Sequence, residues 1–245
     1  KGIYTIPEFV EKRFNKTLKT ILAVFWICLY IFVNLTSVLY LGGLALETIL
    51  GIPMMYSILG LAAFALLYSV YGGLSAVVWT DVIQVAVLVF GGFATSYVAL
   101  NWISGGEGAF AGLGTLLDKV PDHFEMILSV DNAHYKDLPG IAVLIGGLWV
   151  TNLYYWSFNQ YVIQRTFAAK SVKDAQTGLV FAGFLKLIIP LIVVIPGIAA
   201  FYITQYDPAL LQSLQEQFGP MVLNNLPSEQ TPDKAYPWVA QLLPV

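Results

Sequence analysis

GIAVLIGGLWVTNLYYWSFNQYVIQR, residues 140–165, is long and apolar enough to cross a bilayer, which takes about 20 residues of helix. Its centre differs from a simple anchor, because the Gly146–Gly147 pair weakens the helix and the polar residues Thr151 and Asn152 follow at mid-depth. Loosened backbone at the middle of a membrane is tolerated only where it is buried in protein or lines a cavity. Interrupted helices of this kind wall the binding sites of transporters. We therefore interpret residues 140–165 as one wall of a substrate site, with a plain anchor helix as the alternative.

The composition indicates an all-α integral membrane protein. Hydrophobic residues make up 58% of the chain and charged residues only 11%, whereas soluble domains carry about 25% charged residues. The sequence contains no HExxH motif, no carboxylate pair within its apolar segments and no phosphate-binding glycine loop. We therefore expect a protein that is not an enzyme. The first residue is Lys1 and the last is Val245, within a polar segment, so we expect a piece of a longer polypeptide.

Five apolar segments are predicted to cross the membrane as helices. They cover approximately residues 20–46, 54–71, 77–103, 140–161 and 178–203. Between the third and fourth lies a long polar loop with both histidines, which we interpret as solvated because their spacing fits no metal site. Residues 204–245 form a predicted extracytoplasmic loop with short amphipathic pieces such as PALLQSLQEQF. No independent soluble domain is expected.

The distribution of Lys and Arg predicts the orientation of these spans. Five spans alternate in direction, so the amino-terminal segment and the link between the fourth and fifth spans share one side. That side carries eight basic residues and the opposite side three: Lys1, Lys12, Arg13, Lys16, Lys19, Arg165, Lys170 and Lys173, against Lys119, Lys136 and Lys234. Cytoplasmic loops are the ones enriched in Lys and Arg. We therefore expect a cytoplasmic amino end and two long outer loops.

Lys186 lies within the fifth predicted span, about eight residues from its cytoplasmic edge. A charged lysine at the centre of a membrane helix costs roughly 2.5 to over 10 kcal/mol, so it is expected to face a cavity or a partner. No carboxylate lies at matching depth in the five spans. We interpret Lys186 as lining a substrate site, and a structural ion pair with a helix outside this chain is the alternative.

Asn34 and Asn152 lie near the middle of the first and fourth spans. Either amide could simply join helices, a contact worth about 0.6 kcal/mol on average. Together with Lys186, however, they place a polar side chain at similar depth in three spans. Two amides and an ammonium suit a neutral polyhydroxylated solute, whereas an anionic solute is more naturally met by arginine. This pattern favours a sugar as substrate.

Two further residues have alternative interpretations. Tyr155 lies on the same helical face as Asn152, three residues further along, where its ring could stack on a sugar and block the way in, or simply pack. Asp81 lies near the start of the third span. It could cap that helix, because a carboxylate is favoured at an amino end, or it could bind a cation in passage.

Four motifs resemble segments of the sodium:solute symporter family. YGGLSAVVWTDVIQ (residues 71–84) and NQYVIQR (residues 159–165) are similar to two of its signatures. TIPEFVEKRF (residues 5–14) resembles the segment before the third core helix of the family, and DKAYPWVAQLLP (residues 233–244) its outer loop before the eighth. The motifs extend along nearly the whole chain, and the branch that carries galactose or glucose with sodium is the most similar.

The resemblance implies the inverted five-plus-five repeat fold, with core helices three to seven in this chain and the fourth span as the discontinuous helix six. It implies that the positions of Asn34, Asn152 and Lys186 hydrogen-bond the sugar and that Tyr155 stacks on it as the inner gate. The position of Asp81 is associated with sodium passage. The main sodium site is expected on helices absent from this chain, so no metal site is expected within it.

The function expected from the resemblance is secondary active transport in a bacterial inner membrane, with inward sodium flow coupled to uptake of galactose or glucose by alternating access. The partners would be the sugar, the co-transported sodium ion, the lipid bilayer and a second copy in a homodimer, and no nucleic acid. One alternative is a symporter of the same family for proline, a carboxylate or inositol. Others are a passive sugar uniporter and a membrane sensor fused to a signalling module.

Overall fold

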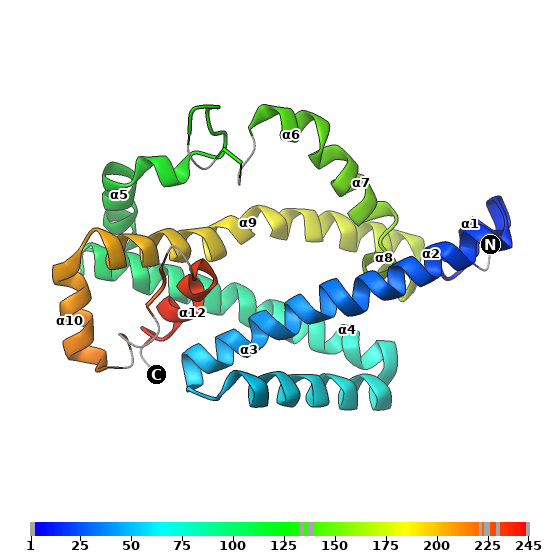
Figure 1. The fold of residues 1–245 in the computed structure, drawn as a ribbon, viewed down its shortest axis with the longest axis horizontal. Helices are drawn as coiled ribbons and strands as arrows, with labels where there is room; N and C mark the ends of the chain where they lie inside the picture. Colours follow the sequence, from blue (N-terminus) through cyan, green and yellow to red (C-terminus); the bar gives the residue numbers. More distant parts are fainter. Residues whose placement is uncertain are drawn as a thin grey trace. The chain divides into compact units, whose positions relative to one another are not determined.

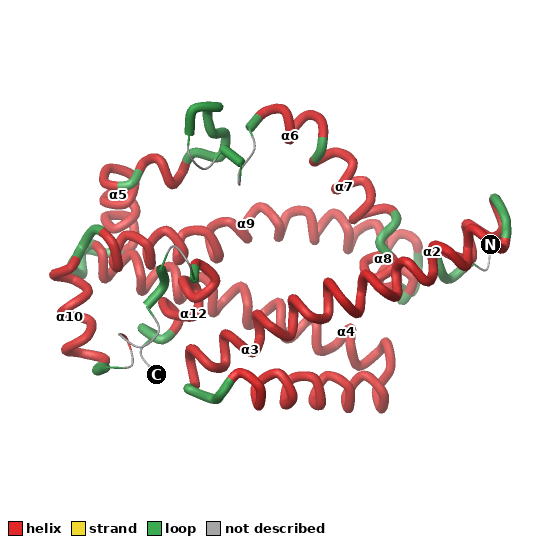
Figure 2. The backbone as a smooth tube through the Cα atoms, in the orientation of Figure 1, coloured by secondary structure: helices red, strands yellow, loops and turns green. Residues whose placement is uncertain are grey.

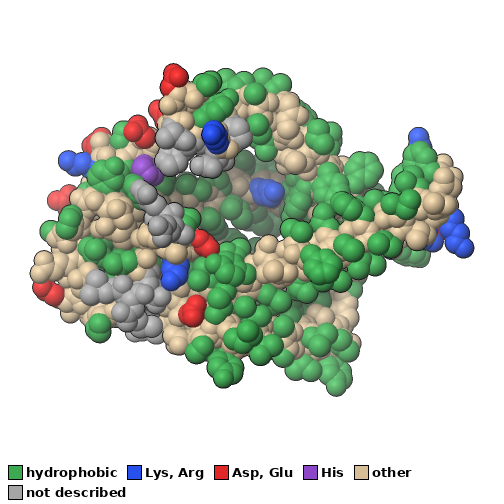
Figure 3. All heavy atoms as spheres, viewed as in Figure 1, with side chains coloured by type: hydrophobic (Ala, Val, Ile, Leu, Met, Phe, Trp, Pro, Cys, Tyr) green, Lys and Arg blue, Asp and Glu red, His purple; other side chains and the backbone are tan. Residues whose placement is uncertain are grey.

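Every regular element in the described part of the chain is helical (Figure 2). The computed structural model describes residues 3–132, 135–136, 140–220, 222, 226–228 and 231–243. Four helical segments within these residues are long and apolar enough to cross a membrane: Lys16–Leu50, Met54–Ile103, Ile141–Phe167 and Val172–Gln205. Their most apolar stretches are at most 6% buried within this chain, and apolar side chains cover much of the face in Figure 3. Such surfaces are typical of helices that face lipid or other helices, and the predicted all-α membrane class is confirmed.

The predicted spans 54–71 and 77–103 form one long helical segment, α4 (Met54–Ile103), with a break inside it. At the break, Gly73 has φ of +58° and ψ of −158°. This conformation is accessible to glycine and strained for residues with a Cβ atom. The chain turns back on itself there, so α4 consists of two arms (Figure 1). Whether each arm crosses the membrane by itself stays a prediction.

The chain divides into two compact units. The first comprises Lys1–Leu35 and Phe124–Ala182, and the second Thr36–His123 and Gly183–Val245. In the first unit lie α1 (Ile6–Arg13), α2 (Lys16–Leu29), a π-helical turn (Tyr30–Leu35), α6 (Ile141–Gly146), α7 (Leu148–Ser157), α8 (Gln160–Phe167) and the start of α9 (Val172–Gln205). The second unit contains α3 (Thr36–Leu50), α4, α5 (Ala109–Lys119), most of a 3₁₀ turn (Pro121–Phe124), the rest of α9, α10 (Pro208–Phe218), a second 3₁₀ turn (Pro232–Lys234) and α12 (Ala235–Ala240).

The core of the second unit lies between the later arm of α4 and the later part of α9. Ile192 is only 1% exposed and packs on Gly92, where an added Cβ atom would come within 2.7 Å of the Ile192 Cβ atom. Beside this contact, the Ser96 hydroxyl donates to the Leu191 carbonyl oxygen at 2.8 Å. A small residue and a serine thus permit close approach of two apolar helices, as is common in membranes.

Short helices in the segments predicted as outer loops cover one end of this core. α10 coincides with the amphipathic piece PALLQSLQEQF and buries Leu214 completely. In α12, the fully buried Trp238 donates its indole N–H to the Val222 carbonyl oxygen at 2.9 Å. His123 is exposed yet stacks on Phe201 with ring centroids 4.3 Å apart; His134 lies outside the described residues. These loops are therefore partly packed, which their polar composition did not predict.

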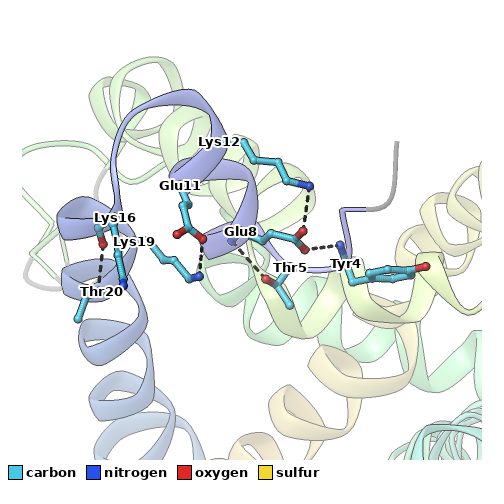
Figure 4. Close-up of polar contacts among 8 residues, drawn as sticks. All are labelled: Tyr4, Thr5, Glu8, Glu11, Lys12, Lys16, Lys19 and Thr20. Carbon is cyan, nitrogen blue, oxygen red and sulfur yellow. Dashed lines mark hydrogen bonds and ion pairs between the residues drawn. The ribbon is translucent and has the colours of Figure 1, made fainter.

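In the first unit, polar side chains join α1 to α2 (Figure 4). Thr5 accepts from the Glu8 backbone N–H at 3.3 Å, and the Glu8 carboxylate accepts from the Tyr4 N–H at 3.1 Å. The Tyr4 N–H, and then Lys12 at 3.0 Å, hold the pKa of Glu8 below its usual value. An ion pair between Glu11 and Lys19 connects the two helices. Polar contacts thus fix the start of α1, and an ion pair connects α1 to α2.

Candidate functional site

The segment that we interpreted as a substrate-site wall is broken twice. α6 ends at Gly146 and α7 begins at Leu148, with Gly147 between them at φ of −96° and ψ of −43°. This first break is slight, because the Gly147 backbone stays in the helical region and its N–H donates to the Val143 carbonyl oxygen at 2.9 Å; the predicted interruption of the span stays a prediction. The second break follows α7 at Phe158, after which Asn159 begins α8 by accepting a hydrogen bond from the Tyr161 backbone N–H at 3.0 Å. The second break was not predicted, because no glycine or proline marks it.

Asn152 is exposed on α7 and uses part of its amide within its own helix. Its Nδ2 atom donates to the Leu148 carbonyl oxygen at 2.8 Å. Thr151 donates its hydroxyl to the same carbonyl at 3.0 Å. This arrangement orients the Asn152 amide and leaves its carbonyl oxygen as an acceptor for a hydroxyl group of a ligand.

Asn34 lies in the π-helical turn Tyr30–Leu35, between α2 and α3. The side chain is exposed. π-Helical turns are rare and are frequently found at functional sites, because the wider turn changes the direction of side chains relative to a regular helix. The sequence places Asn34 within an apolar run but gives no indication of the irregular turn.

Tyr155 is 40% exposed and packs edge-on against Trp156, with ring centroids 5.5 Å apart. Tyr155, Asn34 and Asn152 all belong to the first unit. One unit therefore contains three of the five predicted site residues, on the broken helix and on the π-helical turn.

The other two predicted residues, Lys186 and Asp81, belong to the second unit. Lys186 is exposed on α9 and Asp81 is half-buried on α4. The interpretation of Asp81 as a helix cap is wrong: the helical backbone resumes directly after Gly73, so Asp81 lies about two turns inside the later arm. The role of Asp81 in cation passage and that of Lys186 in sugar binding stay predictions.

A buried polar cluster in the first unit was missed by the sequence interpretation. Asn159 is only 8% exposed, and its Oδ1 atom accepts from the Tyr30 hydroxyl at 3.0 Å as well as from the Tyr161 N–H. The next residue, Gln160, accepts from the backbone N–H of Ile6 at 2.9 Å. The NQYVIQR motif thus links α8 to the π-helical turn and to α1. The motif itself is the only sequence signal for these contacts.

Aromatic side chains pack beside this cluster. Trp26 is 5% exposed, and its ring lies 6.3 Å from that of Tyr30 and 6.4 Å from that of Tyr154, between centroids. An open, apolar groove of about 200 Å³ lies alongside; it is lined by Thr5, Pro7, Ala23, Trp26, Ile27, Tyr30 and Gln160. α2 is therefore held to the broken segment by rings as well as by hydrogen bonds.

Among the described residues, no group of three or more His, Cys, Asp or Glu side chains could hold a metal ion. Chemically, the predicted site residues of the first unit are two amides and an aromatic ring on irregular helical segments. These groups can form hydrogen bonds with a neutral polar solute and stack on its apolar face. They include no pairing of nucleophile and base that would suggest covalent chemistry.

Comparison with known proteins decides the family. Residues 1–236 match the sodium:solute symporter family. The chain belongs to this family. The predicted family is thereby confirmed, and it is a family of symporters and not of enzymes.

Three relatives illustrate the range of similarity. The sodium/glucose cotransporter of Vibrio parahaemolyticus is 71% identical over 245 residues, which are 100% of this chain and 44% of that protein. Sodium/glucose cotransporter 1 of Ovis aries is 29% identical over 217 residues, 80% of this chain and 32% of that protein. Sodium/myo-inositol cotransporter 2 of Homo sapiens is 30% identical over 210 residues, 81% of this chain and 30% of that protein. The chain thus spans less than half the length of these relatives.

Proposed function

We propose that the protein containing this chain is a secondary active transporter that couples inward sodium flow to the uptake of galactose or glucose by alternating access. The observation that carries this proposal is the 71% identity, over every residue of the chain, to a relative named as a sodium/glucose cotransporter. Substrate specificity depends on a small number of side chains, and identity at this level favours retention of the same substrate class.

Asn34, Asn152 and Lys186 are proposed to bind the sugar through hydrogen bonds to its hydroxyl groups. Support comes from the positions of the two amides, on the π-helical turn and on the helix after the Gly147 break. Interrupted helices free polar groups for a ligand at membrane depth. Tyr155 is proposed to stack on the sugar and to form the inner gate.

Sodium is proposed to be the co-transported ion, with Asp81 on its path and its main binding site on helices outside this chain. Sodium would favour an outward-open state that binds sugar, and the return to an inward-open state would release both. A ligand shifts such an equilibrium only by its different affinities for the two states. Sodium therefore needs to bind the outward-open state more tightly.

The proposed location is a bacterial inner membrane, with the amino end of the chain in the cytoplasm and residues 104–139 and 204–245 outside. The distribution of basic residues supports this orientation. A homodimer is the proposed assembly. The exposed apolar surfaces of the spans are compatible with both lipid and a second copy as neighbours.

A second candidate is a sodium symporter for inositol. The similarity to a human sodium/myo-inositol cotransporter, at 30% identity, favours it over proline or a carboxylate. Inositol is also neutral and polyhydroxylated, so the same amides and ammonium could bind it. A passive sugar uniporter remains the alternative without coupling.

The test uses the full-length protein in proteoliposomes. Labelled galactose uptake is followed with and without an inward sodium gradient, with unlabelled galactose, glucose, inositol and proline as competitors. Sodium-driven accumulation that galactose and glucose block, and inositol does not, is the expected result. Competition by inositol alone would identify inositol, and not a sugar, as the substrate. Equilibration of galactose at a rate independent of sodium would identify a uniporter.

A further inference from the structure

We propose that the hydrogen bond between Tyr30 and Asn159 is a positioning clamp, which fixes the spacing between the segments that carry Asn34 and Asn152. The Tyr30 hydroxyl donates to Asn159 Oδ1 at 3.0 Å, across 129 positions of sequence. This inference rests on the proposed function, because it assigns the clamp a role in sugar binding. Neither residue of the clamp is a sugar ligand in this proposal.

The environment of Asn159 makes this bond costly to lose. The residue is 8% exposed, and its Oδ1 atom accepts two hydrogen bonds, one from Tyr30 and one from the Tyr161 backbone N–H at 3.0 Å. Its own backbone N–H donates to the Tyr154 carbonyl oxygen at 3.0 Å. Water does not readily replace a lost partner at a buried site, so hydrogen bonds there hold their geometry firmly.

The clamp joins the two candidate sugar-binding segments at their ends. Tyr30 is the first residue of the π-helical turn, and Asn34 follows four residues later. Asn159 follows the end of α7, seven residues after Asn152. The clamp thus lies within about two helical turns of each amide along the chain. Loss of the hydrogen bond would therefore alter the positions of both amides, Asn34 and Asn152.

Aromatic packing reinforces the hydrogen bond. Trp26 is 5% exposed and lies against the rings of both Tyr30 and Tyr154, at centroid distances of 6.3 and 6.4 Å. It thus contacts both segments, because Tyr30 begins the π-helical turn that carries Asn34 and Tyr154 lies on α7 with Asn152. The packing restricts the Tyr30 ring, which directs the hydroxyl at Asn159.

A fixed spacing lowers the entropy that is lost when a sugar binds two amides at once. Groups already held in the bound geometry give higher affinity because little ordering remains to be done on binding. Without the clamp, the two segments would sample other spacings, and sugar would bind less tightly. The rate of the transport cycle at saturating sugar would change little.

The first test removes only the hydroxyl, with Tyr30→Phe in the full-length transporter. The KM for sugar-dependent, sodium-driven uptake is expected to rise about fivefold, equivalent to about 1 kcal/mol for one hydrogen bond. The maximal rate per transporter molecule in the membrane should stay the same. The matched control is Tyr161→Phe, whose hydroxyl contacts Arg165 within α8 at 3.0 Å; its KM should not change. A lower maximal rate with an unchanged KM in Tyr30→Phe would mean a merely structural role and overturn the proposal.

A double-mutant cycle tests whether the two residues act together. Serine also caps helices well, so Asn159→Ser keeps the start of α8 while its shorter side chain leaves Tyr30 without its acceptor. Each single variant should raise KM to a similar extent, and the double variant should be no worse than either. Additive increases in KM would show independent effects and contradict the clamp.

Hydrogen–deuterium exchange without sugar separates the clamp from the proposed function. In Tyr30→Phe, backbone amides of residues 30–35 and 159–163 should exchange faster than in the wild type, while those of α5 should not. Unchanged exchange would overturn the clamp even if sugar uptake is confirmed. If the wild type takes up no sugar, the proposed function is wrong. In that case faster exchange in Tyr30→Phe would still show a contact between the two segments, but its assigned role in sugar binding would be overturned.

Discussion

The polar side chains in the apolar spans differ in where their hydrogen bonds are directed. Asn152 donates within its own helix, whereas Asn159 accepts from a segment 129 residues away. A bond within one helix orients a side chain without tying it to a neighbouring helix, which fits the proposed role of Asn152 as a sugar ligand. Asn159 is instead arranged to hold two segments together.

Replacement of Asn152 by alanine is expected to weaken sugar binding by about fivefold, since one hydrogen bond contributes about 1 kcal/mol. Thr151→Ala is the matched control, because the Thr151 hydroxyl bonds to the same Leu148 carbonyl within α7. Its affinity should stay within about twofold of the wild type. Equilibrium binding of labelled galactose in sodium measures both. Equal losses in the two variants would point to helix destabilisation in place of ligand contact.

Lys186→Ala is expected to reduce sodium-driven sugar uptake at least about tenfold while the protein still inserts, because a lysine within a span is costly and is retained for a function. Lys173→Ala, near the start of the same helix and exposed, serves as the control and should transport normally. Uptake is normalised to the amount of protein in the membrane. Normal uptake by this variant would show that Lys186 is not a sugar ligand.

The sequence allowed these site residues to be predicted for a physical reason, because an amide or ammonium within an apolar run is conspicuous. It did not allow the clamp to be predicted. A tyrosine such as Tyr30 is ordinary in an apolar helix, and the pairing of residues far apart in sequence leaves no local pattern. The π-helical turn around Asn34 likewise has no characteristic composition.

At the scale of the helices, two breaks differ in their backbone geometry. Gly73 has a positive φ of +58°, where a side chain would be strained. Gly147 has φ of −96° and ψ of −43°, which any residue can adopt. The break at Gly73 therefore requires glycine, whereas the one at Gly147 depends on the low helix propensity of glycine.

Gly147→Ala should favour a continuous helix through α6 and α7, since alanine is better than glycine in a helix by about 1 kcal/mol. An alanine Cβ atom at this position meets Val143 at an ordinary 3.5 Å, so folding should be unaffected. We expect sugar uptake to fall about fivefold. Gly146→Ala, inside α6 and with open space around it, should retain uptake. Equal uptake by the two variants would argue against a functional break.

Gly73→Ala should reduce the amount of folded protein, because its backbone conformation is strained by about 1 to 3 kcal/mol for other residues. Gly60→Ala, in the earlier arm of α4 with nothing near its Cβ position, should fold as well as the wild type or better. The fraction that stays monodisperse in detergent after heating gives the comparison. Equal thermal stability would indicate that the reversal tolerates a side chain.

The helices themselves were largely predictable, because apolar runs of sufficient length have few other solutions in a membrane. Their ends were less so. We placed the third span from residue 77, whereas the helix resumes directly after Gly73. That shift of one turn is what made Asp81 resemble a cap. The polar outer segments also fold into α5, α10 and α12, since buried side chains such as Trp238 outweigh their polar surroundings.

At the scale of the whole chain, charge is distributed unevenly along the sequence. Eight of the twelve basic residues lie in the amino-terminal segment and in residues 165–173. Part of this charge is compensated locally, because Lys12 pairs with Glu8 and Lys19 with Glu11. The rule for orientation depends on Lys and Arg and little on acidic residues, so these pairs leave the predicted orientation unchanged.

Cysteine labelling of the full-length protein in spheroplasts tests this orientation, after replacement of Cys28 and any other cysteine. Ser129→Cys, in the predicted outer loop, should react with a membrane-impermeant maleimide in intact spheroplasts. Ser171→Cys, in the basic link, should react only after lysis; both positions are exposed. The opposite labelling would place α8 on the outer side. Tyr155 would then lie on the extracellular side of the sugar site, and its assignment as the inner gate would be wrong. The assignments of Asn34, Asn152 and Lys186 as sugar ligands would be unaffected.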